Sequence, residues 1–188
     1  MKNLKSIALA LVVLVSTVTV NAQIKKIDVA KSKIEWTGKK VTGQHNGTVN
    51  FKDGYVAFKK SKLNAGSFTV NMTTLTATDL TGEYKDKLDG HLKADDFFGT
   101  EKFPTATLVF KKITPKTAGI YVITADLTIK GITKPVTFDL TVGKNAATTT
   151  LVVNRTSYDI KYGSKSFFDS LGDKAISDEF ELKVSLKF

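Results

Sequence analysis

The stretch that decides the fold is "DEFELKVSLKF", residues 178–188, at the end of the chain. Every second position in it holds an apolar residue, namely Phe180, Leu182, Val184, Leu186 and Phe188. Successive side chains of a β-strand point to opposite faces, so these five share one face and the polar residues share the other. The stretch therefore predicts a strand with one buried face and one face in water.

The same period-two pattern recurs along most of the chain, with β-branched and aromatic residues enriched in it. The predicted strands are 34–36, 47–51, 54–60, 67–75, 105–114, 120–130, 136–142, 148–160 and 180–188. Asp53-Gly54 predicts a hairpin turn, and Gly119, Gly131 and Gly143 mark further reversals. Many strands joined by short links predict an all-β fold, a closed or nearly closed antiparallel sheet in a single domain.

One segment departs from the strand pattern. Its apolar residues step by four, at Leu80, Tyr84, Leu88 and Leu92, which predicts a short amphipathic helix that Gly90 shortens or bends. The connection that follows, His91 to Pro104, is unusually rich in aromatic residues. A closed sheet with one helix and an aromatic connection predicts a barrel with a cover at one end.

The first 22 residues have the pattern of a secretory signal. Lys2 and Lys5 precede an apolar run, and small or neutral residues up to Ala22 suit a signal peptidase. The run is shorter than the roughly 20 residues that span a bilayer, so no membrane span is expected. The sequence predicts a soluble periplasmic or secreted domain, residues 23–188, and the absence of cysteine excludes disulfides and thiolate metal sites.

The formal net charge of +10 raises the question of a polyanionic partner. The lysines are spread along the strands as the polar half of the alternation, as at Lys111, Lys112, Lys183 and Lys187, and not interleaved with aromatic residues in one patch. This distribution speaks against nucleic-acid binding. Lysines on outer strand faces also hinder edge-to-edge pairing, which predicts a monomer or a weak homodimer.

Enzymatic and metal chemistry find little support. The chain has two histidines, His45 and His91, and lacks both a Gly-x-Ser-x-Gly elbow and a His-Glu-x-x-His helix. Asp95 and Asp96 beside Glu101 could form an acid/base pair, but capping of a turn explains them more simply. We expect no catalytic residue, no metal site and no cofactor, and a hydrogen-bonded structural role for His91.

Four blocks together resemble a known family: "KIEWTGKKVTG" (33–43), "GHLKADDFFGTEKFPTATLVF" (90–110), "ADLTIKGITKPVTF" (125–138) and "VVNRTSYDIKYG" (152–163). In this order and spacing they closely resemble the YceI-like family of exported bacterial proteins. The resemblance implies a lipocalin-like antiparallel β-barrel. It also implies a non-catalytic role in carrying or storing a long-chain isoprenoid lipid, such as an isoprenoid quinone or a polyprenyl phosphate, in an apolar cavity.

The resemblance and the apolar strand faces together predict a lipid site. Its residues are Trp36, Phe58, Phe68, Met72, Leu88, His91, Leu92, Phe97, Phe98, Phe110, Ile123, Leu127, Phe138 and Arg155. We expect the tail to lie against Trp36 and Phe138, and the mouth to lie near the helix. Ala125 is expected to face inward as a small residue that a bulky substitution would fill.

Two alternatives stay open at this level. The barrel interior can be a solid core, in which case the chain is a structural or adhesive exported domain whose basic outer face meets an anionic envelope polymer. Arg155 lies on a predicted strand face with Leu151 and Val153, so it needs a partner. That partner is either a carboxylate, Asp159 or Asp126, or the head group of a ligand.

Overall fold

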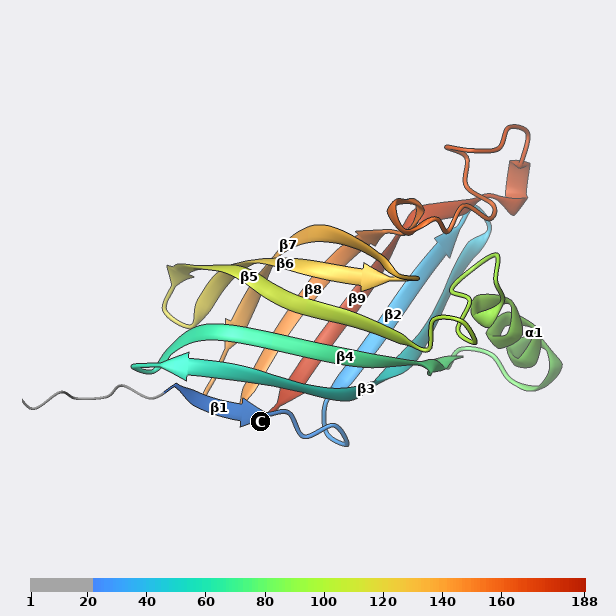
Figure 1. Cartoon of the computed structure of the whole chain (residues 1–188). Coiled ribbons are helices and arrows are strands. Elements are labelled where there is room, and N and C mark those ends of the chain that lie inside the picture. The colour runs from blue at the N-terminus through green and yellow to red at the C-terminus, as the bar shows by residue number, and fades with distance from the viewer. Residues whose placement is uncertain (1–21) are drawn as a thin grey trace, which may run out of the picture.

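The computed structural model describes residues 22–188. All of the predicted signal except Ala22 therefore lies outside the described residues. The strands are β1 (Gln23–Lys26), β2 (Lys33–Lys40), β3 (Gly43–Lys59), β4 (Lys62–Ala77), β5 (Thr105–Thr117), β6 (Ile120–Ile129), β7 (Ile132–Val142), β8 (Ala146–Asn154) and β9 (Ile176–Lys187). One helix, α1 (Gly82–Lys93), joins β4 to β5. Figure 1 shows the strands wrapped into a barrel with α1 at one end.

Eight strands close the barrel in the order β3, β2, β9, β8, β7, β6, β5 and β4, with β4 pairing back to β3. All of the pairs are antiparallel. The short strand β1 pairs with the second half of β3, beyond the part that pairs with β2. The prediction of an all-β, lipocalin-like antiparallel barrel with one short helix is confirmed.

The predicted hairpin at Asp53-Gly54 is wrong. Strand β3 runs through both residues without a break and pairs with β4 on either side of them, with a register shift between Phe51 and Asp53. A Cβ on Gly54 would lie 2.6 Å from the Phe68 ring, so this glycine allows close packing and not a turn. The actual turn follows at Lys60 and Ser61, both with positive φ.

The predicted strand 148–160 also ends early. Strand β8 stops at Asn154, whose side-chain oxygen accepts a hydrogen bond from the Thr156 backbone N–H at 2.9 Å. That bond starts the 3₁₀ helix η1 (Arg155–Tyr158). Arg155 therefore does not belong to a strand face.

The seam between β7 and β8 is the shortest pairing in the barrel wall. Only two residue pairs join these strands, Thr141 with Thr148 and Val142 with Ala147. Each strand is paired along nearly all of its length on its other side, β7 with β6 and β8 with β9. Beyond the two pairs the Thr149 hydroxyl donates to the Asp139 carbonyl at 2.6 Å.

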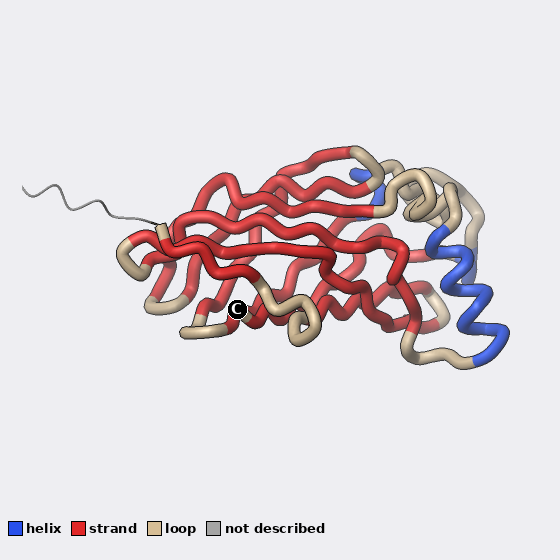
Figure 2. Tube along the Cα trace, turned by 60° about the horizontal axis from the view of Figure 1, so that its bottom comes forward, coloured by secondary structure: helices blue, strands red, loops and turns tan. Residues whose placement is uncertain are grey.

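Helix α1 covers one end of the barrel, as Figure 2 shows. It is short, with 12 residues, and continues through Gly90 to Lys93, so Gly90 does not end it. Leu92 is buried and Leu88 half-buried, but Tyr84 is 77% exposed and does not contribute to the buried face. Among residues 22–188 no helix has the length and apolar character needed to cross a membrane.

Gly47 on β3 allows the closest packing in the barrel wall. A Cβ at this position would lie 2.0 Å from the Thr76 carbonyl oxygen and 2.4 Å from the Trp36 indole. Because a backbone oxygen in a paired strand cannot move aside cheaply, we expect Gly47→Ala to lower the free energy of unfolding by about 3 kcal/mol, at the upper end of the usual cost of overpacking. Urea unfolding followed by circular dichroism measures this change.

Gly90→Ala is the matched control for that prediction. Nothing lies within 4 Å of a Cβ at Gly90, which is in the interior of α1. Alanine there should stabilise the chain by up to about 1 kcal/mol through helix propensity. An unfolding midpoint of Gly47→Ala equal to that of the unsubstituted chain would contradict the packing argument.

Candidate functional site

A row of aromatic rings crosses the barrel interior. The centroids of Phe51 and Phe68 are 6.1 Å apart, those of Phe68 and Phe110 are 5.7 Å apart, and those of Phe110 and Phe138 are 6.3 Å apart. Phe110 and Phe138 come from β5 and β7, which lie on either side of β6. They meet because β6 presents the small side chain of Ala125 beside Phe110.

Gly66 supports this row by the absence of a side chain. A Cβ on Gly66 would lie 2.5 Å from the Phe110 ring. Gly54 stands in the same relation to Phe68. The two glycines therefore let the Phe110 and Phe68 rings pack directly against the backbone of the barrel wall.

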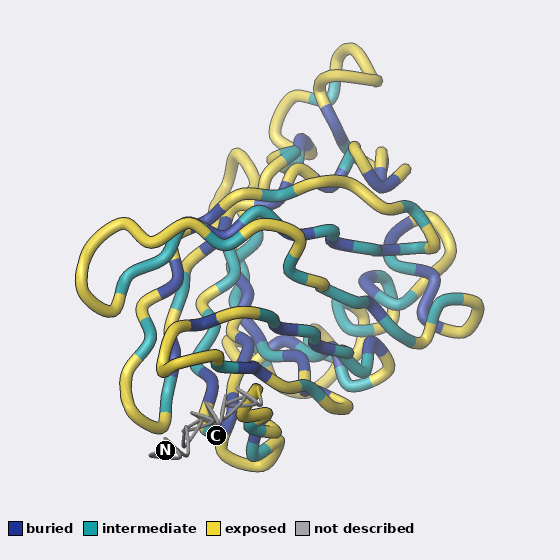
Figure 3. The backbone as a smooth tube through the Cα atoms, turned by 60° about the vertical axis from the view of Figure 1, so that its left-hand side comes forward, coloured by how far each residue is buried: buried dark blue, intermediate teal, exposed yellow. Residues whose placement is uncertain are grey.

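The interior is incompletely filled along β9. Leu182 pairs with buried Trp36 and buried Leu151, and Val184 pairs with buried Ile34, so both face inward. Both are nevertheless only half-buried. In a close-packed core such inward residues would be fully covered. Figure 3 shows partly exposed segments of this kind among buried ones along the strands.

On the β6 side, by contrast, the interior is densely packed. Ile123 and Ala125 are both 0% exposed. The expectation that Ala125 offers open space is therefore wrong, because the neighbouring Phe110 and Val136 cover it. Half-buried inward residues occur on β9 and also on other strands, as at Phe110 of β5 and Val136 of β7, and strand alternation does not distinguish such positions from plain core.

The aromatic connection after α1 closes the barrel end beneath the helix. Phe97 packs against Phe98 with centroids 5.3 Å apart, and Phe98 meets Phe180 of β9 at 6.1 Å. His91 lies 5.4 Å from Phe97 and 4.5 Å from Tyr162, both edge to face. Its Nε2 is buried and has no hydrogen-bond partner within the described chain. His91 is thus held by ring contacts rather than by the expected hydrogen bond.

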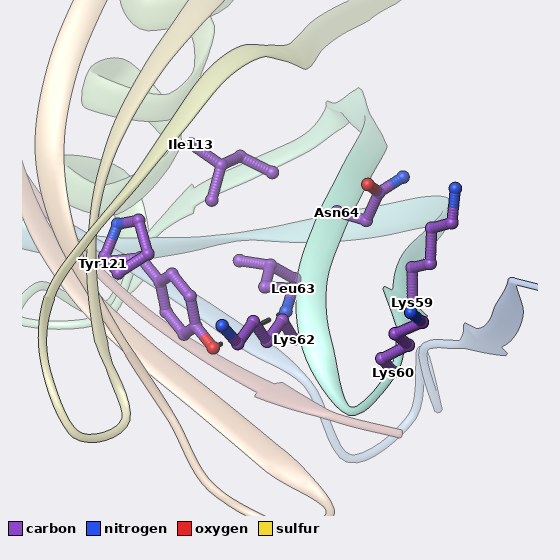
Figure 4. Close-up of a pocket in the computed structure, with 8 residues that line it drawn as sticks. Lys59, Lys60, Lys62, Leu63, Asn64, Ile113 and Tyr121 are labelled. Atoms are coloured by element: carbon purple, nitrogen blue, oxygen red, sulfur yellow. Dashed lines mark hydrogen bonds between the residues drawn. The ribbon is translucent and has the colours of Figure 1, made fainter.

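A cavity of about 380 Å³ lies at the opposite end, between the β3–β4 hairpin and the β5–β6 hairpin. Its apolar lining is Leu63, Ile113, Pro115 and Tyr121, and its rim is Lys59, Lys60, Lys62 and Asn64. Figure 4 shows the Tyr121 hydroxyl pointing toward the Leu63 backbone, whose N–H lies 3.5 Å away. This site could not be predicted from the sequence, because its residues come from two hairpins that only the closed barrel brings together.

Arg155 is 2% exposed, and its guanidinium makes its hydrogen bonds within the chain. It donates to three backbone carbonyls, those of Ile160 at 2.8 Å, Ile176 at 3.1 Å and Ser177 at 2.8 Å. The Asp178 carboxylate lies 3.7 Å away, and the Phe97 ring lies 5.7 Å from the guanidinium carbon.

A carboxylate was one of the expected partners of Arg155, and Asp178 is one, but it is neither of the two residues that were named. Asp159 pairs instead with Lys161, and Asp126 lies 3.4 Å from Lys111. Arg155 joins η1, the start of β9 and the aromatic connection at the covered end of the barrel.

Burial and the neighbouring charge shift the pKa values of both Arg155 and Asp178. Desolvation lowers the pKa of Arg155, and the nearby Asp178 carboxylate opposes that change. Burial also disfavours ionisation of Asp178, but the nearby hydroxyls of Ser164 and Ser166, the second of which donates a hydrogen bond to Oδ2, and the charge of Arg155 outweigh it. The pKa of Asp178 therefore lies below its ordinary value, and the pair is ionised at neutral pH.

Twelve of the fourteen predicted site residues lie in one apolar cluster. The cluster includes Trp36, Phe58, Phe68, Met72, Leu88, Leu92, Phe97, Phe98, Phe110, Ile123, Leu127 and Phe138. The other two, His91 and Arg155, pack at its α1 end through Phe97.

The polar residues considered for chemistry lie apart from this cluster. His45 bonds Asp79 at 3.0 Å, and Asp95 pairs with Lys102 on the surface. Within residues 22–188 no three His, Asp or Glu side chains gather closely enough to hold a metal ion. A second cavity of about 460 Å³ lies near the α1 end and mixes Lys39, Lys40 and Lys165 with Asp178 and Glu179.

A closed eight-stranded antiparallel barrel with an apolar interior and a covered end defines a lipocalin-like barrel protein. Residues 26–188 match the family model described as the YceI-like domain, and the chain belongs to that family. A UPF0312 protein of Shewanella denitrificans is 40% identical over 91 residues, 48% of this chain and 46% of that protein. Protein YceI of Escherichia coli is 37% identical over 90 residues, 47% of this chain and 45% of that protein.

The matched part of this chain thus spans about half the length of these curated relatives. Solved structures share the fold over more of it. BcnA of Burkholderia cenocepacia superposes with a TM-score of 0.69 at 24% identity, covering 85% of this chain and 98% of that one. A polyisoprenoid binding domain from Saccharophagus degradans gives a TM-score of 0.57 at 13% identity, covering 89% of this chain and 97% of that one.

Proposed function

We propose that the chain binds a long-chain isoprenoid lipid inside the barrel and carries or stores it without chemical change. The observation that carries the proposal is the incomplete burial of inward-facing apolar residues along β9, Leu182 and Val184 above all. The resemblance of the fold to a polyisoprenoid binding domain supports the choice of ligand class.

The tail supplies the driving force in this proposal. Burying one CH₂ group contributes about 0.8 kcal/mol. Three to four isoprene units would therefore contribute roughly 12 to 16 kcal/mol, which offsets an association cost of about 4 to 15 kcal/mol. A head group at a wet rim adds about 0 to 1 kcal/mol per exposed ion pair, so it tunes selectivity rather than affinity.

The proposed mouth is the cavity at the hairpin end and not, as the sequence predicted, the end near α1. Phe97, Phe98 and Phe180 pack against one another at the α1 end, which supports its role as the closed end. The 380 Å³ cavity at the other end continues the apolar lining through Leu63 and Ile113. A tail entering there would run toward Trp36 and the aromatic row.

The site in this proposal comprises the predicted lumen residues together with Leu182 and Val184. We leave Arg155 out of the proposed site because three of its donors bond backbone carbonyls. We further propose export of the domain 23–188 to the periplasm or the exterior, as the pattern of the first 22 residues suggests.

Thermal unfolding with added lipid tests the proposal. A ligand that binds only the folded state stabilises it by about 2.7 kcal/mol at a hundredfold excess over its dissociation constant. For a domain of this size we expect the melting temperature to rise by about 5 to 10 °C with an isoprenoid quinone or a polyprenyl phosphate. Differential scanning calorimetry over a lipid titration measures the rise.

Organic extraction of the purified, unheated protein provides the second measurement. Mass spectrometry of the extract should find an isoprenoid lipid in near-stoichiometric amount. A flat melting temperature together with an extract free of lipid would mean that the interior is a solid core, and the chain would then be a structural exported domain.

A further inference from the structure

Positive charge is concentrated at the end of the barrel opposite α1. Four segments meet there: β1 (Gln23–Lys26), the β3–β4 turn 59–62, the β5–β6 turn 115–119 and the β7–β8 turn 143–145. Together they contain seven lysines and no acidic residue. We name these four segments the basic end.

Contacts between the segments place them side by side. The Lys25 ammonium donates to the Lys144 carbonyl at 2.7 Å, and it lies 5.6 Å from the Phe58 ring, next to the β3–β4 turn. The cavity already described joins the β3–β4 turn to Pro115. The basic end is therefore one continuous surface around the proposed mouth.

The charges of the basic end are almost unopposed. Among the described residues only one of its seven lysines, Lys116, has a carboxylate within 4 Å, that of Asp139 at 2.6 Å. The one acidic residue of the adjoining loop 27–32, Asp28, pairs with Lys31. The three rim lysines, Lys59, Lys60 and Lys62, are all exposed.

Helix α1 and the connection that follows it have the opposite charge balance. Residues 82–104 contain six acidic residues and four lysines. Three of those lysines pair with carboxylates, in Lys85–Asp89, Lys87–Glu83 and Lys102–Asp95. Residues 82–104 thus have a formal charge of 4 − 6 = −2, whereas the basic end has seven lysines and no acidic residue.

We infer that the basic end is a docking surface for an anionic lipid bilayer. Clustered lysines are attracted to the negative surface of such a bilayer, each contributing a factor of about five to binding. Ile24 of β1 is 63% exposed beside these lysines, which adds an apolar side chain for contact with the interface. Docking in this orientation holds the cavity against the membrane and turns the acidic segment 82–104 away from it.

This inference goes beyond the proposed function, because it rests on surface charge and not on the contents of the lumen. It also gives the proposed cavity a source of lipid. Attraction of this kind is screened by salt, so binding should weaken as ionic strength rises.

Vesicle flotation tests the inference directly. The unsubstituted protein should bind at low salt to phosphatidylcholine vesicles in which about a third of the lipid is phosphatidylglycerol. It should not bind to vesicles of pure phosphatidylcholine. The triple variant Lys59→Gln, Lys60→Gln, Lys62→Gln should bind the anionic vesicles about a hundredfold more weakly, since each near-surface lysine contributes a factor of about five.

The matched control is Lys39→Gln, Lys40→Gln, Lys165→Gln. It removes the same charge from three exposed lysines that line the cavity near the α1 end. We expect it to bind anionic vesicles within about twofold of the unsubstituted protein, because these lysines face away from the bilayer in the docked orientation. Equal losses in both variants, or no binding of the unsubstituted protein to anionic vesicles, would overturn the inference.

Extraction of lipid from the same variants separates this inference from the proposed function. Loss of vesicle binding with a retained lumen lipid supports both. Lipid in the extract without any vesicle binding would overturn the docking surface alone. Vesicle binding that depends on Lys59, Lys60 and Lys62, with no lipid in the extract, would support the docking surface and reject the lipid carrier.

Discussion

Arg155→Leu is expected to lower the free energy of unfolding by about 3 to 5 kcal/mol, the usual cost of removing one partner of a buried ion pair. The substitution leaves three carbonyl groups without their donor and the Asp178 carboxylate without its counter-charge. Each buried group left unsatisfied costs about 1 to 3 kcal/mol. Urea unfolding measured by tryptophan fluorescence reports the change through Trp36.

Two further variants separate structure from ligand binding at this position. Arg155→Lys keeps the charge but cannot reach three carbonyls at once, so an intermediate loss of stability is expected. Asp178→Asn removes only the counter-charge and should cost less than Arg155→Leu. A leucine variant of unchanged stability that had lost its affinity for polyprenyl phosphate would return Arg155 to the ligand site.

Val184→Trp is expected to abolish lipid retention while the barrel stays folded. Val184 faces the lumen and is half-buried, so the indole would project into the part of the lumen in which the proposed ligand lies. In a close-packed core the same change would cost about 1 to 3 kcal/mol. We expect a smaller loss of stability together with at least a tenfold loss of co-purifying lipid, measured by mass spectrometry of the extracted protein.

Val152→Trp is the control for this experiment. Val152 lies on the neighbouring strand β8, points outward and is 56% exposed. The same substitution there adds the same ring without touching the lumen, so lipid retention should not change. Equal retention by the two variants would place the ligand outside the barrel, and loss of folding in Val184→Trp alone would indicate a solid core.

Most strands of the barrel wall were predictable because each carries its own alternation, but β1 and the β3–β4 turn were not. The β3–β4 turn at Lys60 and Ser61 contains no glycine or asparagine, although both residues have positive φ. Asp53-Gly54 has the residues of a turn and is strand, because Gly54 makes room for the Phe68 ring. Turn chemistry is local, whereas the need for space beside a ring depends on the folded barrel.

The candidate site was predictable to a similar degree. The apolar faces identified the inward residues, because period two assigns each side chain to a face. The alternation does not predict how deeply each inward residue is buried. It therefore did not separate Ala125, which is fully buried, from Val184, which is half-buried. The partners of Arg155 were equally hidden, since they come from residues 160 to 178, after the point where β8 ends.

The interface between β7 and β8, with only two residue pairs, is where we expect the barrel diameter to change most easily. Local opening begins in the units with the fewest hydrogen bonds, and the other seven strand pairs of the barrel are more extensively bonded. Widening at this one edge enlarges the bore while the register of the remaining wall stays fixed. If a lipid of the proposed class is wider than the bore, we expect the barrel to open first at this seam, at the cost of a few hydrogen bonds.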